Sequence, residues 1–165
     1  MTLKKTSNIV DKTYKELSIQ VSLSGLSFCT IDTLEKKVEV LEHYAFNGIT
    51  SLDSILVQLD YHFANSNLNA TRFNKITLLH ENELSTFVPK PLFNEHSLPE
   101  YLKFNIKMLE NDFITFDELP NAELVNVYIP YVHVNNYIFD QFGPFEYKHF
   151  TTVLVENLLQ KAPAA

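Results

Sequence analysis

Polar and apolar positions alternate along residues 17–44, and the alternation predicts three consecutive antiparallel strands. Between Leu17 and Leu23, four apolar residues are separated by serine or glutamine, the period of a strand with one buried face. Ser24 and Gly25 follow and predict a tight turn, in which glycine would accept a positive φ. The first two strands should therefore form a hairpin.

The next two segments predict a central strand and an edge strand. Residues 26–31 are apolar at both parities, as expected for a strand covered on both faces. Residues 37–44 carry lysine, glutamate and histidine on one face, and charged side chains are typical of an exposed sheet edge. We expect the second strand inside the sheet and the third at or near its edge.

The remaining patterns predict helices that alternate with further strands. Apolar stripes and capping residues predict four helices, over residues 52–65, 98–109, 130–142 and from Thr151 through Leu154, Leu158 and Leu159. Apolar runs predict four more strands: 76–79, parallel to the first; 85–89, in a hairpin with 76–79; 124–129, parallel and internal; and 145–149. The expected fold class is α/β, with one mixed sheet of at least five strands.

Composition places the chain among compact globular proteins. It has 165 residues, 45% of them hydrophobic, which is enough for the core of one domain. The formal net charge is −7 and Arg72 is the only arginine, so the electrostatic attraction that nucleic-acid binding requires is weak. We therefore expect no nucleic-acid partner.

Other counts predict a cytoplasmic protein without direct membrane insertion. The single cysteine, Cys29, excludes an internal disulfide framework, and no long apolar run follows Lys4 and Lys5 as it would in a secretory signal. The longest apolar runs are too short to cross a bilayer. With three glycines, the chain also lacks a glycine-rich phosphate-binding loop.

We expect three regions along the chain. Residues 1–16 are polar and aperiodic and should form a flexible N-terminal arm. Residues 17–150 hold the predicted sheet and most of its helices. Residues 151–165 should form a terminal helix and tail, a possible link to a second lobe.

The candidate chemistry is limited to one polar cluster and six histidines. The sequence His80-Glu81-Asn82-Glu83 follows a predicted strand, on the side of an α/β sheet where ligands collect. The cluster could form a metal or acid/base site, but a polar turn is the simpler interpretation because no second cluster accompanies it. No two histidines have the spacing of two ligands on one helix face, so we interpret them as surface or capping residues.

Four sequence segments resemble a known family. They are FVPKPLF at 87–93, EYLKFN at 100–105, ELVNVYIP at 123–130 and FEYKH at 145–149. They are similar to the first half of a family of uncharacterised bacterial proteins with an actin-like ATPase fold, whose architecture resembles that of the pilus-assembly protein PilM. The resemblance implies a ribonuclease H-like mixed sheet, a three-strand antiparallel meander followed by alternating helices and strands. A second lobe would follow in that family, so the chain is either a fragment or a single-lobe relative.

The resemblance also gives a nucleotide site to test. In members of the superfamily that use ATP, the first strand ends in an aspartate and a glycine that hold metal and phosphate. Gln20 stands at the aspartate position and Ser22 at the glycine position. A neutral amide cannot balance Mg²⁺ as a carboxylate does. The turn containing Ser22, Ser24 and Gly25 could still offer amide groups to a phosphate.

Two functional hypotheses follow from these residues. In the first, the chain is a non-catalytic module that binds another protein, either a second lobe or a second copy of itself as a homodimer. In the second, it is a nucleotide-binding ATPase whose cleft needs a second lobe and uses Asp32, Glu81 or Glu83. We adopt the first and assign no catalytic residue, no metal ligand and no cofactor, with Mg·ATP as the alternative.

Overall fold

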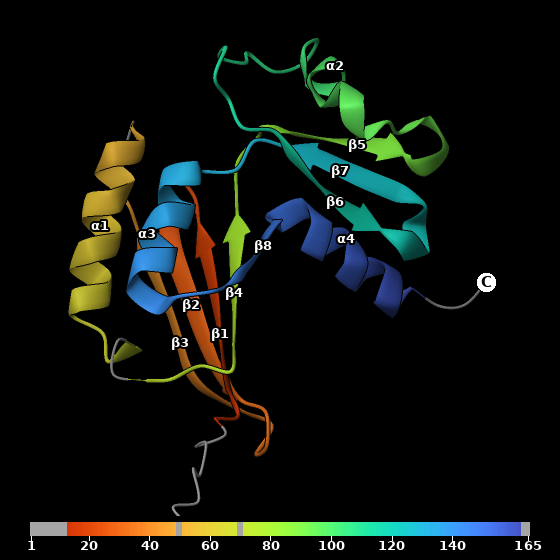
Figure 1. Ribbon diagram of the computed structural model, residues 1–165. Helices are drawn as coiled ribbons and strands as arrows, with labels where there is room; N and C mark the ends of the chain where they lie inside the picture. The colour runs from red at the N-terminus through yellow and green to blue at the C-terminus, as the bar shows by residue number, and fades with distance from the viewer. Residues whose placement is uncertain (1–12, 49–50, 69–70, 163–165) are drawn as a thin grey trace, which may run out of the picture.

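The computed structural model describes residues 13–48, 51–68 and 71–162 and contains two separate sheets. The larger has five strands in the order β3-β2-β1-β4-β8, and the smaller has three in the order β5-β7-β6 (Figure 1). The predicted mixed sheet of five strands is therefore confirmed. The expectation that all strands share one sheet is wrong.

The predicted meander forms one side of the larger sheet. Its strands are β1 (Lys15–Val21), β2 (Gly25–Asp32) and β3 (Lys37–Ala45), paired antiparallel, with β3 at the edge as predicted. β1 begins two residues earlier than expected, so Lys15 and Glu16 belong to the sheet and not to the predicted arm. Of the rest of that arm, residues 1–12 lie outside the described residues.

Gly25 is needed for a reason other than the one we predicted. It is the first residue of β2 and does not have a positive φ, unlike Gly48 and Gly143. A Cβ atom at Gly25 would lie 2.7 Å from the backbone oxygen of Tyr44, closer than real Cβ contacts allow. The close approach of β3 therefore selects glycine here.

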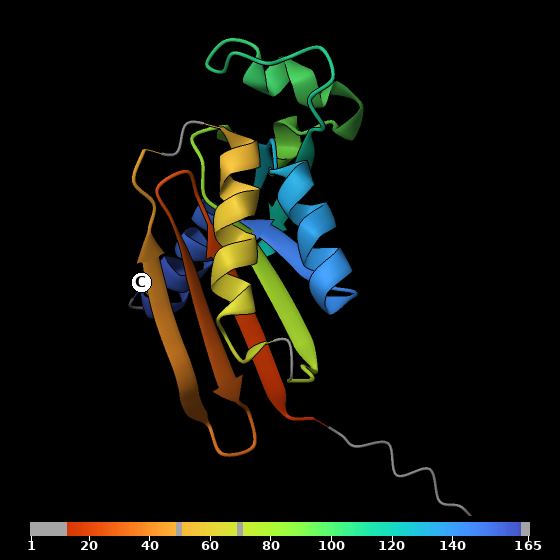
Figure 2. The same ribbon diagram turned by 90° about the vertical axis from the view of Figure 1, so that its left-hand side faces the viewer.

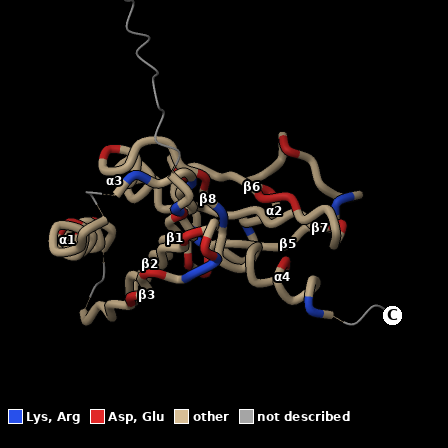
Figure 3. The backbone as a smooth tube through the Cα atoms, turned by 90° about the horizontal axis from the view of Figure 1, so that it is seen from below, with Lys and Arg blue, Asp and Glu red and all other residues tan. Residues whose placement is uncertain are grey.

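Two parallel strands complete the larger sheet. β4 (Lys75–His80) pairs parallel with β1, as predicted, and β8 (Glu146–His149) pairs parallel with β4. The helices α1 (Leu52–Ala64) and α3 (Val132–Phe142) cover one face, and α4 (Phe150–Lys161) lies on the other (Figures 2 and 3). Ser51 caps α1 by accepting a hydrogen bond from the Ser54 N–H.

The smaller sheet corrects three expectations. It contains β5 (Ser85–Pro89), β6 (Thr115–Leu119) and β7 (Leu124–Tyr128), all antiparallel. β5 pairs with β7 and not with the preceding strand, and β7 is internal but not parallel. β6 forms between the predicted helix 98–109 and the predicted strand 124–129, where we predicted no strand, because pairing with β7 gives its backbone groups partners.

The helices of this region also differ from the predictions. The predicted helix 98–109 ends early, as α2 (Leu98–Leu102), and packs on the smaller sheet. Short 3₁₀ turns occupy Lys90–Leu92, Glu95–Ser97 and Pro120–Ala122. In α4, the predicted apolar stripe of Leu154, Leu158 and Leu159 is exposed, and the buried residue of the helix is Thr152. The contacts of α4 with the sheets are therefore partly polar.

Candidate functional site

The candidate site lies at the carboxyl ends of the parallel strands β1, β4 and β8. In the strand registers Val21 lies beside His80, and His80 lies beside His149, so the three strands end together. Ligands of open α/β sheets bind at such an edge. The turn after β1 and the loop after β4 both start here.

The turn after β1 is closed by the side chain of Ser22. Its Oγ accepts hydrogen bonds from the backbone N–H groups of Ser24 and Gly25, both at 3.1 Å, and Ser22 N–H donates to the Gly25 oxygen at 3.0 Å. Ser22 is 7% exposed. The hydroxyl thus occupies two of the amides that a phosphate would use, as serine does in many tight turns.

Gln20 is bound to one of the three candidate acids. Its Nε2 donates a 2.8 Å hydrogen bond to Oε2 of Glu81. Glu81 is held through its backbone, because its N–H donates to the Val21 oxygen and its oxygen accepts from the Tyr131 hydroxyl. The structure therefore places a neutral amide and one carboxylate together at the strand ends.

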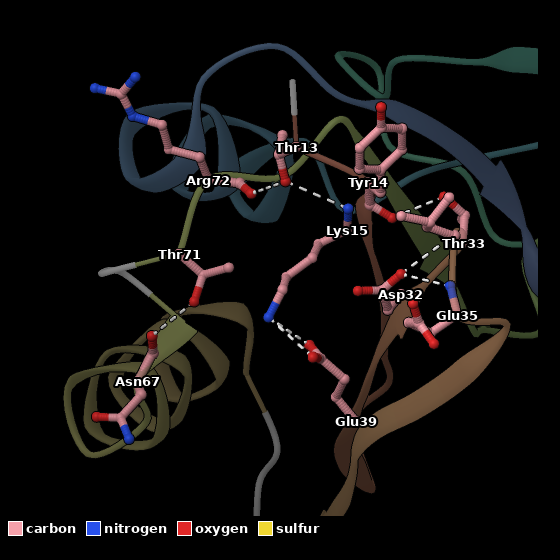
Figure 4. Close-up of polar contacts among 11 residues, drawn as sticks. Thr13, Tyr14, Lys15, Asp32, Thr33, Glu35, Glu39, Asn67, Thr71 and Arg72 are labelled. Atoms are coloured by element: carbon pink, nitrogen blue, oxygen red, sulfur yellow. Dashed lines mark hydrogen bonds and ion pairs between the residues drawn. The ribbon is translucent and has the colours of Figure 1, made fainter. Parts of the chain in front are cut away.

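The other two candidate acids do not join them. Asp32 lies opposite Lys15 at the far end of the sheet, where its Oδ1 accepts the N–H groups of Leu34 and Glu35 at 2.9 Å (Figure 4). Glu83 is exposed in the loop between β4 and β5. Of the acids proposed for an ATPase, only Glu81 is at this edge.

His80 is buried, which corrects its prediction as a surface or capping residue. Its Nδ1 accepts the Tyr131 N–H at 3.3 Å, so the proton is on Nε2, which donates to Asn135 Oδ1 at 2.8 Å. Burial lowers the pKa of His80 to about 4, against the raising effect of the Asn135 hydrogen bond. The ring is neutral and holds the start of α3.

His149 is also buried but is a capping residue, as the histidines were predicted to be. It caps α4 in place of Thr151: its Nδ1 accepts the Thr151 N–H at 3.3 Å and the Thr151 hydroxyl at 2.7 Å. The opposite ring nitrogen donates to Asn82 Oδ1 at 3.2 Å. Burial lowers the pKa of His149 to about 4.

Asp117, which the sequence reading assigned to a loop, joins the two sheets. Its Oδ2 accepts the His149 N–H at 2.8 Å and the Thr152 hydroxyl at 2.7 Å, and its Oδ1 accepts the Tyr128 hydroxyl at 3.0 Å. Burial raises the pKa of Asp117 above its ordinary value, and these hydrogen bonds oppose that rise. Burial and the nearby Asp117 carboxylate raise the pKa of Tyr128.

Asn126 completes this polar junction. Its Nδ2 donates to the hydroxyl oxygens of Thr151 and Thr152, both at 3.0 Å. Its Oδ1 is buried and has no hydrogen-bond partner among the described residues. The only sequence signal for the junction was the polar loop His80–Glu83, whose Asn82 is hydrogen-bonded to His149. The other members lie apart from one another along the chain, between Asp117 and Thr152.

A mostly apolar groove of about 430 Å³ adjoins the strand ends. Exposed side chains on its rim include Leu109, Phe113 and Val132. Within the described part of the chain, no three His, Cys, Asp or Glu side chains gather as a metal site. The same part contains no helix long and apolar enough to span a membrane.

These residues do not fit Mg·ATP bound as in the ATP-using members of the superfamily. The amides of the turn are held by Ser22, and Gln20, at the position that the resemblance assigns to the metal-binding acid, is bound to Glu81. A hard cation favours charged oxygen ligands, and an anion needs free N–H donors. The arrangement supplies neither in the expected place.

Comparison with known proteins gives a family and a fold. Residues 4–165 match the family described as Protein of unknown function (DUF3822). No curated protein matches the chain. A solved structure from Bacteroides thetaiotaomicron, a protein with an actin-like ATPase fold and unknown function, superposes with a TM-score of 0.76 at 18% identity. The superposition covers 88% of this chain and 56% of that one, and it confirms the predicted actin-like fold.

A second solved structure is less similar. It is the cytoplasmic domain of EpsL, an inner-membrane component of the type II secretion system of Vibrio cholerae, with a TM-score of 0.48 at 14% identity. That superposition covers 81% of this chain and 55% of that one. The chain thus spans little more than half the length of either structure.

Proposed function

The chain belongs to the DUF3822 family of proteins of unknown function, and from this premise we propose that it is a non-catalytic actin-like module that acts by binding another protein. The partner is a second lobe or a second copy of the chain. In this proposal the module works in the cytoplasm, and the smaller sheet and the exposed apolar side chains serve assembly.

One observation carries the proposal: the groups that would meet a nucleotide are bound to each other. Ser22 Oγ accepts the Ser24 and Gly25 amides, and Gln20 donates to Glu81. Phosphoryl transfer depends on positioning and on metal charge. Here the amides are occupied by Ser22, and a glutamine stands in place of the metal-binding acid. The site therefore lacks the means to position a phosphate and to hold a metal.

The exposed apolar surface supports a binding role. Leu109, Phe113 and Val132 border the groove beside the strand ends, and Leu154 and Leu158 are exposed on α4. Exposed apolar patches mark sites of protein association or ligand binding. The groove and the exposed face of α4 are two separate patches, and each suits a partner that covers it.

Phosphate release at saturating Mg·ATP tests the proposal, with wild type compared with Gln20→Asp and with Gln20→Asp/Ser22→Gly. We expect no release from wild type above a heat-inactivated control, and no heat of binding in a calorimetric titration with Mg·ATP. Glu83→Gln serves as a charge-change control at an exposed position two residues from Glu81. Turnover by the wild type would overturn the proposal.

The alternative is a nucleotide-binding ATPase whose cleft needs a second lobe. One observation favours it: the Glu81 carboxylate lies at the strand ends beside Gln20. In that case wild type would turn over ATP when the second lobe is present, and Glu81→Gln would abolish that turnover while Glu83→Gln would not. The two variants remove the same charge from neighbouring positions, so they separate a role in the site from a general charge effect.

A further inference from the structure

The edge strand β3 has an outer side that pairs with no other strand among the described residues. It is nine residues long and contains a bulge, because Thr30 lies opposite Val40 whereas Ile31 lies opposite Val38. The extra residue, Glu39, shifts the alternation of side chains between the two ends of the strand.

Because of the bulge, four exposed side chains of β3 lie in two pairs, one pair on each face of the sheet. Lys37 and Glu42 lie opposite Asp32 and Phe28, on the face covered by α1. On the other face, Val38 and Leu41 lie opposite Ile31 and Cys29. Val38 is 53% exposed and Leu41 is 74% exposed. One face of the edge thus carries two opposite charges, and the other carries two large apolar side chains.

The charges of the strand are not all free. Glu39 is bound by Lys15 Nζ at 2.8 Å (Figure 4). Glu42 accepts a hydrogen bond from the Tyr44 hydroxyl but has no cationic partner among the described residues, and Lys37 has no anionic one. Lys37 and Glu42 are therefore the charges of β3 available to a partner.

We propose that β3 pairs antiparallel with β3 of a second copy, about a two-fold axis that passes between Glu39 and Val40. This register places Lys37 opposite Glu42 of the second copy, and Val38 opposite Leu41 of the second copy. The symmetry makes each pair occur twice. Without the bulge, the two members of each pair would lie on opposite faces of the sheet, because their residue numbers differ by an odd number. With it, they lie on the same face. The proposal rests on the proposed function and names the partner as the chain itself.

Electrostatics selects this register. Charged side chains usually protect an edge from pairing, but opposite charges placed directly across from each other stabilise a strand pair. A slip of two residues in one direction places Glu42 opposite Glu39, and a slip in the other places it opposite Glu35 of the preceding turn. Both slips bring like charges together, which is unfavourable.

The helix α1 adds surface to the same contact. His62 of α1 stacks on Tyr44 of β3, with ring centroids 3.9 Å apart, so the helix lies close to the sheet edge. Its neighbour Tyr61 is 63% exposed. In the proposed dimer, the two α1 helices lie on the same face of a continuous sheet, one on each side of the axis.

Sedimentation velocity over a concentration series tests the interface on the whole chain. We expect wild type to form a species of twice the 19.1 kDa chain mass. Lys37→Glu and Glu42→Lys should each raise the dissociation constant about tenfold or more, because two like-charge pairs replace two opposite ones. The double variant Lys37→Glu/Glu42→Lys should restore dimerisation. Glu95→Lys, an exposed charge change in the turn Glu95–Ser97, should leave wild-type dimerisation unaltered.

Two results would overturn the inference: a wild type that stays monomeric through the series, or a double variant that dimerises no better than the single ones. Circular dichroism of each variant separates lost folding from lost association. The outcome is independent of the ATP assay. A dimer that hydrolyses ATP would refute the proposed function and support the interface. A monomer without ATPase activity would refute the interface and agree with the proposed function.

Discussion

The backbone N–H of His149 donates a 2.8 Å hydrogen bond to the carboxylate of Asp117, and this contact joins the larger sheet to the smaller one. Asp117 also accepts the hydroxyl groups of Tyr128 and Thr152. The sheets have separate apolar clusters, so polar groups at the junction set how the two sheets are joined.

Asp117→Ala should therefore destabilise the protein by about 2–4 kcal/mol, because it leaves three donors without their acceptor in a buried place. The matched control is Glu118→Ala, which removes an exposed ion pair with Lys90 and should change stability by less than about 1 kcal/mol. Urea unfolding of both variants measures the difference. Equal losses would mean that the junction contributes no more than a surface contact.

Acid should weaken the fold through His80 and His149. Their folded pKa is about 4 and their unfolded pKa is about 6.5, so between these values the unfolded chain binds more protons. Stability is constant above the unfolded pKa and falls as the pH drops toward 4, by up to about 1.4 kcal/mol per pH unit for each histidine. Unfolding at pH 7 and pH 5 checks this.

The control for the acid effect is the exposed His96. His149→Gln should reduce the pH dependence by roughly half. His96→Gln, a substitution at an exposed position of the turn Glu95–Ser97, should leave the pH dependence unchanged. The raised pKa of Asp117 acts in the opposite direction, because a folded state that keeps a proton gains stability in acid. A stability that rises on acidification would show that Asp117 dominates.

The turn after β1 should depend on the Ser22 hydroxyl. Ser22→Ala removes the acceptor of the Ser24 and Gly25 amides and should cost about 1–2 kcal/mol. Ser24→Ala removes an exposed hydroxyl that is hydrogen-bonded to the Ser22 hydroxyl at 2.8 Å, and it should cost less than Ser22→Ala because no backbone amide loses its acceptor. Thermal unfolding of the two variants measures the difference in stability. A larger loss of stability from Ser24→Ala would contradict the role given to Ser22.

Core substitutions should rank by burial. Val127 is fully buried in the smaller sheet, so Val127→Ala should cost about 2–3 kcal/mol through lost contacts and a cavity. Leu56 of α1 is only partly buried, and Leu56→Ala should cost less than Leu59→Ala in the same helix. Guanidinium unfolding of the three variants gives the order, and a cost at Leu56 equal to that at Leu59 would contradict it.

Glu123 has a left-handed backbone, with a φ of 51°, just before β7. Glu123→Gly should raise the free energy of unfolding by about 1 kcal/mol, because glycine adopts this region without steric cost. Asn121→Gly, in the same turn but without a positive φ, should lower it. Unfolding curves showing a loss at Glu123→Gly would indicate that its side chain has a role that the backbone does not explain.

The sequence by itself determined the elements whose signals are local. Alternation predicted β1 and its neighbours, and the apolar stripe and capping residues predicted α1, which Ser51 caps. The parallel pairing of β4 was also predictable, because a helix between two strands of one sheet usually makes them parallel. The family resemblance then predicted the actin-like fold, which the solved structure confirms.

Only the tertiary structure decided which strands share a sheet. β5 and β7 are short, and residues 90–123 lie between them, so nothing local distinguishes their pairing from a hairpin with β4. β6 carries polar residues and becomes a strand only because β7 supplies hydrogen-bond partners. The junction of Asp117, Asn126 and His149 follows from that pairing, since residues distant in sequence meet only once both sheets have formed.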